Sequence, residues 1–287
     1  MQIFQKLLHS LNLFKEKNQE VLVKQINIPS KYLKRGVRVD AYLPPSYENN
    51  KKKEYPVIFF NDGQDLGAMS MKQTLTNLYK SNTLTPTIIF GIYANPDNRM
   101  NEYGTTRQAD YKNRGNLANQ YESFVLHELL PTLNAEFACT NDANARVFAG
   151  FSLGGLSAID LVWANSDLFH KVGVFSGSLW WRSAPYQFGY DDQHRIMHDI
   201  IQHSTYQENL KFWFEVGTKD ETEDRNKNGI IDAIDDTLDL INDLSSLGYK
   251  PHDDIKYVEV QDGEHNPKTW GAVMPDFLKW ATDSIKN

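Results

Sequence analysis

The segment at residues 150–155 reads Gly-Phe-Ser-Leu-Gly-Gly and places a serine in the pattern G-x-S-x-G. The five residues before it, 145–149, have the composition of a short buried strand, and residues 156–164 have the pattern of a helix with an apolar face. Glycines permit a strained turn and the close passage of the neighbouring chain. The helix directs its N-terminal N–H groups towards developing negative charge. This strand–turn–helix pattern predicts that Ser152 is a nucleophile.

Alternating strands and helices are predicted around that turn. Residues 21–28 and 37–43 alternate between apolar and polar side chains, as half-exposed antiparallel strands do. Continuous apolar runs at 56–60 and 87–92 are typical of parallel strands covered on both faces. Three more strands are expected at 171–175, 210–216 and 255–260. Helical patterns stand between or after them at 121–136, 191–203, 233–247 and 268–285. We expect an α/β-hydrolase fold, a doubly wound and mostly parallel sheet of about eight strands with antiparallel N-terminal strands.

Length and composition favour one domain. The 287 residues contain no linker, repeat or low-complexity tract, so a single domain is expected over residues 1–287, with a helical extension over 1–18. The formal net charge of −7 gives no reason to expect a nucleic-acid partner. Cys139 is the one cysteine, so no intrachain disulfide can form. No signal peptide and no membrane span are recognised, and a cytoplasmic location is expected.

His265 is the histidine whose position suits a catalytic base. A serine hydroxyl needs a base to remove its proton, and in this fold the base follows both the serine and an acid in the chain. The active site of such a sheet lies at the carboxyl ends of its strands. His265 comes directly after the last expected strand, whereas the other histidines precede the serine, precede a strand or lie on or beside a predicted helix. The order of elements therefore selects His265.

The acid that orients this histidine is expected in the turn after the 210–216 strand. Asp220 is the first candidate, followed by Glu221 and then Asp224. Spacing ranks them no further, and several carboxylates of this turn must simply be solvated.

Two backbone N–H groups are expected to hold the oxyanion. One belongs to Leu153, the residue after the nucleophile. The other should come from the loop after the 56–60 strand, where Gln64 is the first candidate and a glycine would let the chain approach the site. An ordinary Asp-Gly turn is the alternative interpretation of that loop.

Further motifs accompany the serine over residues from about 56 to 270, and GFSLGG with SGSLWW is the most specific combination. The others are DGQD, NRMNEY, GTKD and GEH. Together they resemble the Putative esterase family of α/β-hydrolases, which includes enterochelin esterases, feruloyl esterases and mycolyltransferases. The resemblance implies that Trp180 and Trp181 lie over the acyl site, with at least one partly exposed. It also places Arg99 and Glu102 beside the pocket, where they would position a polar substrate or simply pair with each other.

A second pattern, D-x-N-x-N-G-x-x-D-x-x-D, has the spacing of a calcium loop. Its oxygen donors would be five side chains and one backbone carbonyl, at Asp224, Asn226, Asn228, Ile230 (the carbonyl), Asp232 and Asp235. The last position is aspartate rather than the usual glutamate, so the loop is closer to a dockerin loop than to a typical EF-hand. The alternative is an acidic turn that caps the helix beginning near residue 233. A bound Ca²⁺ would brace the acid turn from behind.

The predicted function is a serine carboxylic-ester hydrolase that works through a Ser-His-Asp triad and an acyl-enzyme intermediate. Its partner would be a small-molecule ester, and catalysis would require no cofactor, with Ca²⁺ as a structural ion only. An acyltransferase with the same triad and a non-catalytic binding protein on the same fold are the alternatives. The acyl group, the alcohol group and the oligomeric state are left open.

Overall fold

The computed structural model describes residues 20–45, 47, 53–187 and 189–283. The helical extension predicted over 1–18 lies outside these residues. Within the described ranges, no helix combines the length and the apolar character that a membrane span requires.

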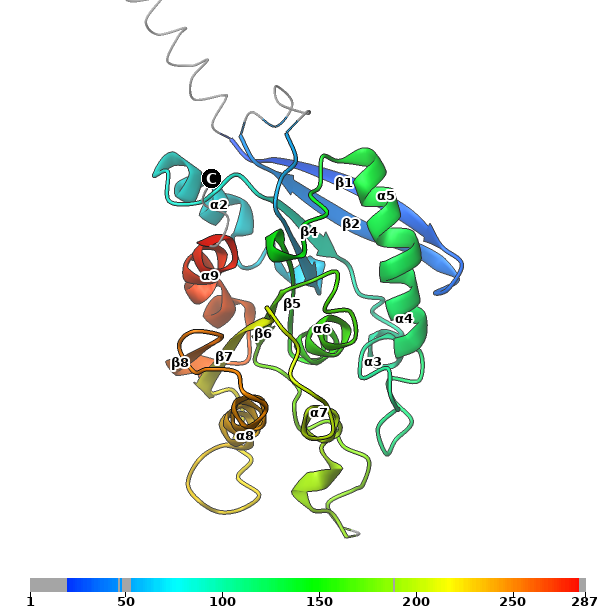
Figure 1. Ribbon diagram of the computed structural model, residues 1–287, viewed down its shortest axis with the longest axis vertical. Coiled ribbons are helices and arrows are strands. Elements are labelled where there is room, and N and C mark those ends of the chain that lie inside the picture. The colour runs from blue at the N-terminus through cyan, green and yellow to red at the C-terminus, as the bar shows by residue number, and fades with distance from the viewer. Residues whose placement is uncertain (1–19, 46, 48–52, 188, 284–287) are drawn as a thin grey trace, which may run out of the picture.

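One sheet of eight strands crosses the described part of the chain, in the order β1-β2-β4-β3-β5-β6-β7-β8 (Figure 1). β1 pairs antiparallel with β2 and β2 pairs antiparallel with β4, while every other neighbouring pair is parallel. This confirms the predicted α/β-hydrolase sheet with its antiparallel N-terminal strands. The strands are Leu22–Ser30, Arg35–Leu43, Val57–Asn61, Ile88–Ile92, Arg146–Phe151, Lys171–Phe175, Lys211–Lys219 and Ile255–Glu264, from β1 to β8.

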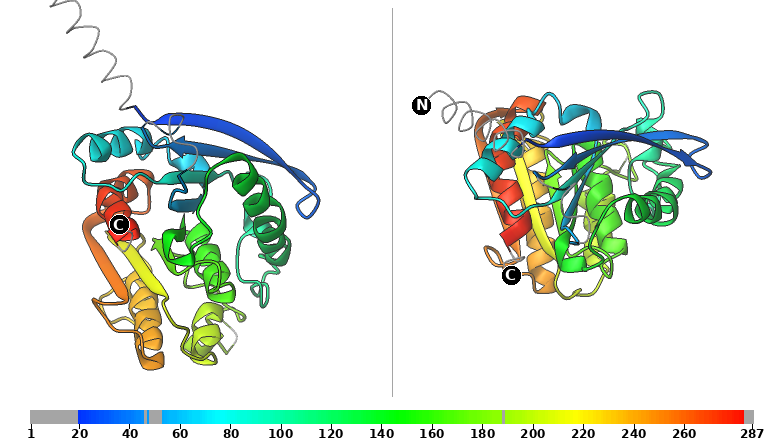
Figure 2. Two further views of the ribbon diagram at one scale, coloured as in Figure 1. Left: turned by 45° about the horizontal axis from the view of Figure 1, so that its top comes forward. Right: turned by 90° about the horizontal axis from the view of Figure 1, so that it is seen from above.

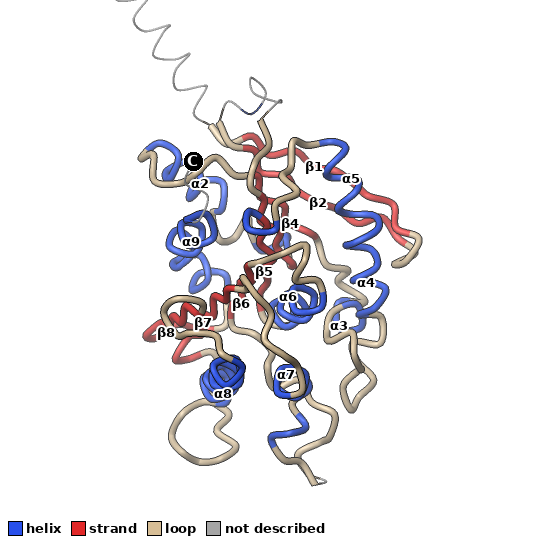
Figure 3. Tube along the Cα trace, viewed as in Figure 1, coloured by secondary structure: helices blue, strands red, loops and turns tan. Residues whose placement is uncertain are grey.

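Helices cover both faces of the sheet, as Figures 2 and 3 show. On one face lie α2 (Met71–Lys80) and α9 (Pro267–Thr282), whose apolar side chains share one buried cluster. The other face is covered by α4 (Ala118–Phe124), α5 (Leu130–Glu136), α6 (Leu153–Ala164), α7 (Ile196–Gln202) and α8 (Asp232–Leu247). A π-helical turn, Val125–Leu129, joins α4 to α5, and the short α3 (Arg99–Glu102) follows β4.

Aromatic side chains of β3 fill the space on both faces of the sheet. Phe59 stacks on Phe90 of β4 and Phe148 of β5, with ring centroids 5.4 and 5.7 Å apart. Phe60, the next residue, points to the opposite face and stacks on Phe151 at 5.7 Å. A strand buried on both faces needs apolar residues at every position, which is why its sequence is a continuous apolar run.

Three elements differ from the prediction, and two of them, β7 and β8, affect the site. α2 was not predicted, although its buried Met71, Leu75 and Leu78 have the i, i+4, i+7 spacing of an amphipathic helix. β7 and β8 extend to Lys219 and Glu264, several residues beyond the expected ends. Their polar tips bond to each other: the Asp262 N–H donates to the Thr218 hydroxyl at 2.8 Å. Asp220 and His265 therefore follow their strands directly.

Phe59→Ala tests how much the fold depends on this aromatic layer. Removal of a fully buried ring with three aromatic neighbours should lower the free energy of unfolding by about 3–5 kcal/mol, measured by urea denaturation. Leu238→Ala on the exposed face of α8 is the control and should change stability by less than about 0.5 kcal/mol. Equal losses in the two variants would contradict the assigned core.

Candidate active site

Ser152 stands on a sharp turn between the central strand β5 and helix α6. Its backbone angles, φ 57° and ψ −124°, lie in a region that is strained for a side chain-bearing residue. The turn closes this tightly because glycines meet across it. A side-chain carbon on Gly150 would lie 2.2 Å from the Gly154 carbonyl oxygen, and one on Gly154 would lie 2.4 Å from Asp62 Oδ2. This tight strand–turn–helix segment, the serine elbow, has the half-buried Ser152 at its apex.

The strand and loop beside the elbow hold its backbone. The Ser152 N–H donates to the Phe175 carbonyl at 2.8 Å, and the Ser178 N–H donates to the Ser152 carbonyl at 3.1 Å. The hydroxyl oxygens of Ser152 and Ser178 are 3.4 Å apart. Ser178 belongs to the SGSLWW motif but was not singled out from the sequence as a neighbour of the nucleophile.

The structure brings His265 and Asp220 together. Both follow parallel strands, so both reach the edge of the sheet where β5 ends. His265 Nδ1 lies 3.7 Å from Asp220 Oδ2, with the carboxylate side chain 1% exposed and the imidazole 39% exposed. Among the described residues no hydrogen bond joins His265 to the Ser152 hydroxyl. Of the other acid candidates, Asp224 lies further along in the loop before α8, and burial raises the pKa of Glu221 to about 7.

Trp270, which sequence reasoning did not select, supports the histidine from α9. Its ring meets the His265 imidazole edge-on, with centroids 5.4 Å apart and an interplanar angle of 80°. The same indole stacks on Phe151, the residue before the nucleophile, at 5.0 Å. Its Nε1 donates to the Ser176 hydroxyl at 2.8 Å. One side chain thus links the histidine to the elbow.

The loop after β3 presents Gln64 in a short 3₁₀ turn, Gly63–Asp65. The first N–H groups of a helix lack partners within it, so the N–H groups of Gln64 and of Leu153, which begins α6, are both candidate oxyanion donors. The Gln64 side chain braces the loop: Nε2 donates to Asp62 at 3.0 Å, and Oε1 accepts from the Ala94 N–H at 3.2 Å. Gly63 packs on β4, because a side-chain carbon there would lie 2.3 Å from the Gly91 carbonyl carbon.

Asp62 anchors this loop to the elbow. Its carboxylate, 1% exposed, receives two hydrogen bonds from the Arg99 guanidinium, each 2.7 Å long. Arg99 Nη2 also donates to the Phe151 carbonyl at 3.3 Å. Asn61 adds a second tie, because its Nδ2 donates to the Gly154 carbonyl at 2.8 Å. The Ser152 turn and the loop that carries Gln64 are therefore held by one polar network.

Arg99 and Glu102 do not pair with each other, which corrects one of the two roles expected for them. Arg99 binds Asp62, as described, and its side chain is 26% exposed. Glu102 is buried and accepts two hydrogen bonds from Arg35 of β2, at 3.0 and 2.6 Å. With both oxygens held by Arg35, Glu102 has no exposed oxygen to offer a substrate.

The two tryptophans of SGSLWW have different surroundings. Trp181 is fully buried, whereas Trp180 is partly exposed. The Arg114 guanidinium lies 5.4 Å from the Trp180 ring and 5.0 Å from the Trp181 ring, and it pairs with Asp110. Trp180 is therefore the aromatic residue that can meet a ligand.

The predicted calcium loop lies between β7 and α8 (Figure 1). Asp224 accepts the Asn228 and Gly229 N–H groups at 3.2 and 2.9 Å, and Asp235 accepts the side-chain amides of Asn226 and Asn228. Within the described ranges, no group of three or more His, Cys, Asp or Glu side chains is placed to hold a metal ion.

Asp232, one of the predicted calcium ligands, contacts Arg225 in the structure. Its Oδ1 accepts the Arg225 N–H at 2.8 Å and lies 3.3 Å from the Arg225 guanidinium. Arg225 also contacts Asp236 at 2.6 Å. Asp224, Asn226, Asn228 and Asp235 remain as the side chains that approach one another.

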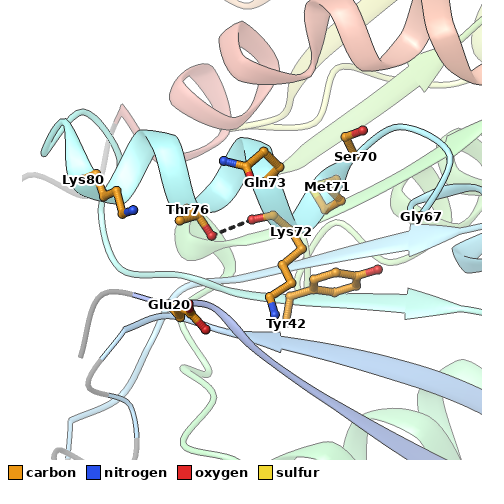
Figure 4. Close-up of a pocket in the computed structure, with 9 residues that line it drawn as sticks. All are labelled: Glu20, Tyr42, Gly67, Ser70, Met71, Lys72, Gln73, Thr76 and Lys80. Atoms are coloured by element: carbon orange, nitrogen blue, oxygen red, sulfur yellow. Dashed lines mark hydrogen bonds between the residues drawn. The ribbon is translucent and has the colours of Figure 1, made fainter. Parts of the chain in front are cut away.

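A hollow of about 460 Å³ runs along α2, away from these residues (Figure 4). The hydrogen bond drawn in it, from the Thr76 hydroxyl to the Lys72 carbonyl at 2.8 Å, belongs to the helix itself. None of the predicted catalytic residues lines it, and its walls are formed by Glu20, Tyr42, Gly67, Ser70, Met71, Lys72, Gln73, Thr76 and Lys80.

The sheet, the serine elbow and the residues at the strand ends define an α/β-hydrolase. The model of the Putative esterase family matches residues 30–281, so the chain belongs to that family. Among solved structures, a ferulic acid esterase superimposes with a TM-score of 0.71 at 20% identity, over 93% of this chain and 99% of that one. An enterobactin esterase from Shigella flexneri gives 0.72 at 22% identity, over 93% and 60%. These likenesses show the same fold.

Curated relatives match at low identity. The uncharacterized protein YbbA of Bacillus subtilis (strain 168) is 28% identical over 151 residues, which are 51% of this chain and 59% of YbbA. YjcH of the same organism is 23% identical over 252 residues, 87% of this chain and 93% of YjcH. An endo-1,4-beta-xylanase/feruloyl esterase of Xylanibacter ruminicola is 23% identical over 165 residues, 54% of this chain and 21% of that protein. The match spans less than two thirds of YbbA and of the xylanase.

Arg99→Met tests the tie between the two loops. The substitution leaves the buried Asp62 carboxylate without its cation, so the free energy of unfolding should fall by roughly 2–4 kcal/mol. This loss is smaller than for a fully buried pair, because Arg99 is partly exposed to solvent. Arg107→Met, which breaks the exposed pair with Asp199, is the control and should cost less than about 1 kcal/mol. Urea denaturation measures both, and an unchanged Arg99→Met midpoint would contradict this role.

Proposed function

We propose that this protein is a serine esterase in which Ser152, His265 and Asp220 form a catalytic triad. The observation that carries the proposal is the convergence of three groups from separate strand ends. A strained serine follows β5, a buried carboxylate follows β7, and an imidazole within 3.7 Å of that carboxylate follows β8. Parallel strands end at one edge of the sheet, so these groups share one side of the molecule.

Acylation follows from the orientation of the imidazole. His265 Nδ1 faces Asp220, so Nε2 is the nitrogen left to accept the Ser152 proton. The Ser152 oxygen forms a bond to the ester carbonyl carbon, and the negative charge moves to the carbonyl oxygen. The N–H groups of Leu153 and Gln64 would hold that oxyanion. The alcohol then leaves with the proton from His265. Among the described residues no hydrogen bond joins Ser152 to His265. Catalytic hydrogen bonds often form or shorten only when substrate binds, so the mechanism does not require this bond in the free enzyme.

Deacylation uses water in place of the alcohol. His265 removes a proton from water, whose oxygen attacks the acyl carbon, and Ser152 leaves as the hydroxyl after taking the proton back. The imidazole is 39% exposed, so solvent can reach it. This exposure supports hydrolysis over acyl transfer, which needs the acyl-enzyme to be covered against water.

We propose an aromatic ester as the substrate class. Trp180 lies two residues beyond Ser178, whose hydroxyl is 3.4 Å from that of Ser152, and Trp180 keeps part of its ring exposed. An indole face offers a large flat apolar surface for stacking. The names of the ferulic acid and enterobactin esterases refer to aromatic acids or their esters, and support the same class for this chain.

Ser152→Ala is expected to lower the turnover of a short-chain aryl ester by about 10⁶-fold, since the nucleophile is lost. Asp220→Asn should lower it by about 10⁴-fold, because the amide no longer holds the required imidazole tautomer. Ser178→Ala is the matched control, a serine with its hydroxyl 3.4 Å away, and should retain turnover within about tenfold of wild type. Undiminished hydrolysis by purified Ser152→Ala would reject the mechanism.

We also propose that the 224–235 loop binds Ca²⁺ as a structural ion. If Ca²⁺ binds only the folded state, the free energy of unfolding should rise by about 2.7 kcal/mol at a hundredfold excess of Ca²⁺ over Kd. The serine mechanism needs no metal, so the melting temperature should rise while turnover changes little. The measurement is a melting curve of metal-stripped protein in excess Ca²⁺ and in chelator, with Asp235→Asn as the comparison. Identical melting curves of the wild type in Ca²⁺ and in chelator would contradict Ca²⁺ binding and favour the alternative, an acidic turn that caps the helix.

A further inference from the structure

A second buried carboxyl belongs to β7, the strand that Asp220 follows. Glu215 is the fifth residue of β7 and is 1% exposed. Side chains two residues apart on a strand point to the same face, so Glu215 and Gly217 share a face. A side-chain carbon on Gly217 would lie 2.9 Å from Asp220 Oδ1. The Asp220 carboxyl therefore folds back over Gly217, one position along the strand face from Glu215.

The two carboxyl groups lack the partners that buried carboxylates usually have. In the described part of the chain, the buried oxygens of Asp220 have no hydrogen-bond donor, and Glu215 has only the neutral donors of Ser176 beside it. A buried carboxylate without a donor or a cation is costly, and two adjacent carboxylates cannot both keep their charge. Asp220 is the one beside His265, at 3.7 Å, so Asp220 is the one to carry the charge.

The surroundings of Glu215 connect it to the rest of the site. The Ser176 N–H donates to the Glu215 carbonyl at 2.7 Å, and the Ser176 hydroxyl accepts from Trp270, which packs on His265. Two titratable groups interact electrostatically with Glu215. They are Asp220, which follows the same strand, and Tyr257 of β8. Burial, and then the charge of Asp220, raise the pKa of Glu215 to about 8.

We propose that Glu215 is a positioning residue that stays protonated and shares its proton with Asp220, holding that carboxylate towards His265. The proposal rests on the serine esterase function argued above. The carboxylic acid O–H of Glu215 is the donor that the Asp220 carboxylate otherwise lacks. A 3.7 Å separation is too long for a hydrogen bond, so Asp220 needs a second restraint to remain aimed at the imidazole.

Glu215→Gln and Glu215→Leu separate this role from a merely structural one. Glutamine keeps the shape and an N–H donor without the titration, whereas leucine keeps only the bulk. At pH 7 we expect Glu215→Gln to have kcat within about threefold of wild type, and Glu215→Leu to lose roughly tenfold to a hundredfold in kcat with KM unchanged. Above pH 8, wild-type kcat should fall as Glu215 ionises and repels Asp220, and Glu215→Gln should lack that fall. The exposed Glu208→Gln is the control and should follow wild type throughout.

Stability provides a readout that does not depend on esterase activity. The pKa of Glu215 is higher in the folded than in the unfolded chain, so the stability that its proton contributes is full below about pH 4.5 and is lost as the pH rises through about 8. Wild type should therefore lose free energy of unfolding relative to Glu215→Gln over this interval. An esterase whose Glu215 variants match wild type in kcat, pH profile and stability would overturn the proposal. A protein that hydrolyses no ester but shows the stability difference would instead reject the serine esterase function and, with it, the positioning role, and keep only the protonated Glu215.

Discussion

The contact between Gly150 and Gly154, made without side chains, sets the position of Ser152 in the candidate site. It lets α6 begin directly at the end of β5, so Ser152 has no room to relax from its strained backbone conformation. The helix that follows is buried from residue 153 to residue 163, and this burial opposes the strain. The serine is consequently fixed at the N-terminus of a helix that cannot shift. The other groups of the site are placed relative to that fixed point by the strands on either side.

Two kinds of support surround the elbow. On the β3 side, the buried Asp62–Arg99 pair ties the Gln64 loop to the carbonyl of Phe151, so the two candidate oxyanion donors move as one unit. On the β8 side, Trp270 packs against both Phe151 and His265. The charged pair of Asp62 and Arg99 holds the loop that carries Gln64, and the aromatic contact of Trp270 holds His265. This division suits a serine mechanism, in which the oxyanion needs preorganised dipoles and the imidazole needs a defined orientation.

The sequence predicted what depends on local pattern and on the order of elements. Ser152 was selected because its turn is a contiguous motif, and His265 because it is the histidine that follows a strand in the expected chain order. Asp220 was ranked first without a geometric reason, and the extension of β7 to Lys219 supplies one. The pairing of Arg99 with Asp62, and of Glu102 with Arg35, could not be foreseen, because it depends on which loops pack across the sheet. Glu215 was likewise hidden, since it sits within a run of strand residues and acts through a neighbour on the same face.

A direct measurement of the central claim is mass spectrometry of the wild-type protein, quenched in acid during turnover of a slowly deacylated aryl ester. Trypsin cleaves after Arg146 and Lys171, so Ser152 and Ser178 fall in different peptides. We predict that the mass of one acyl group appears on the 147–171 peptide and that fragmentation places it on Ser152. An acyl group on any other residue, or turnover of the ester with no acylated protein at any time after mixing, would contradict the proposed mechanism.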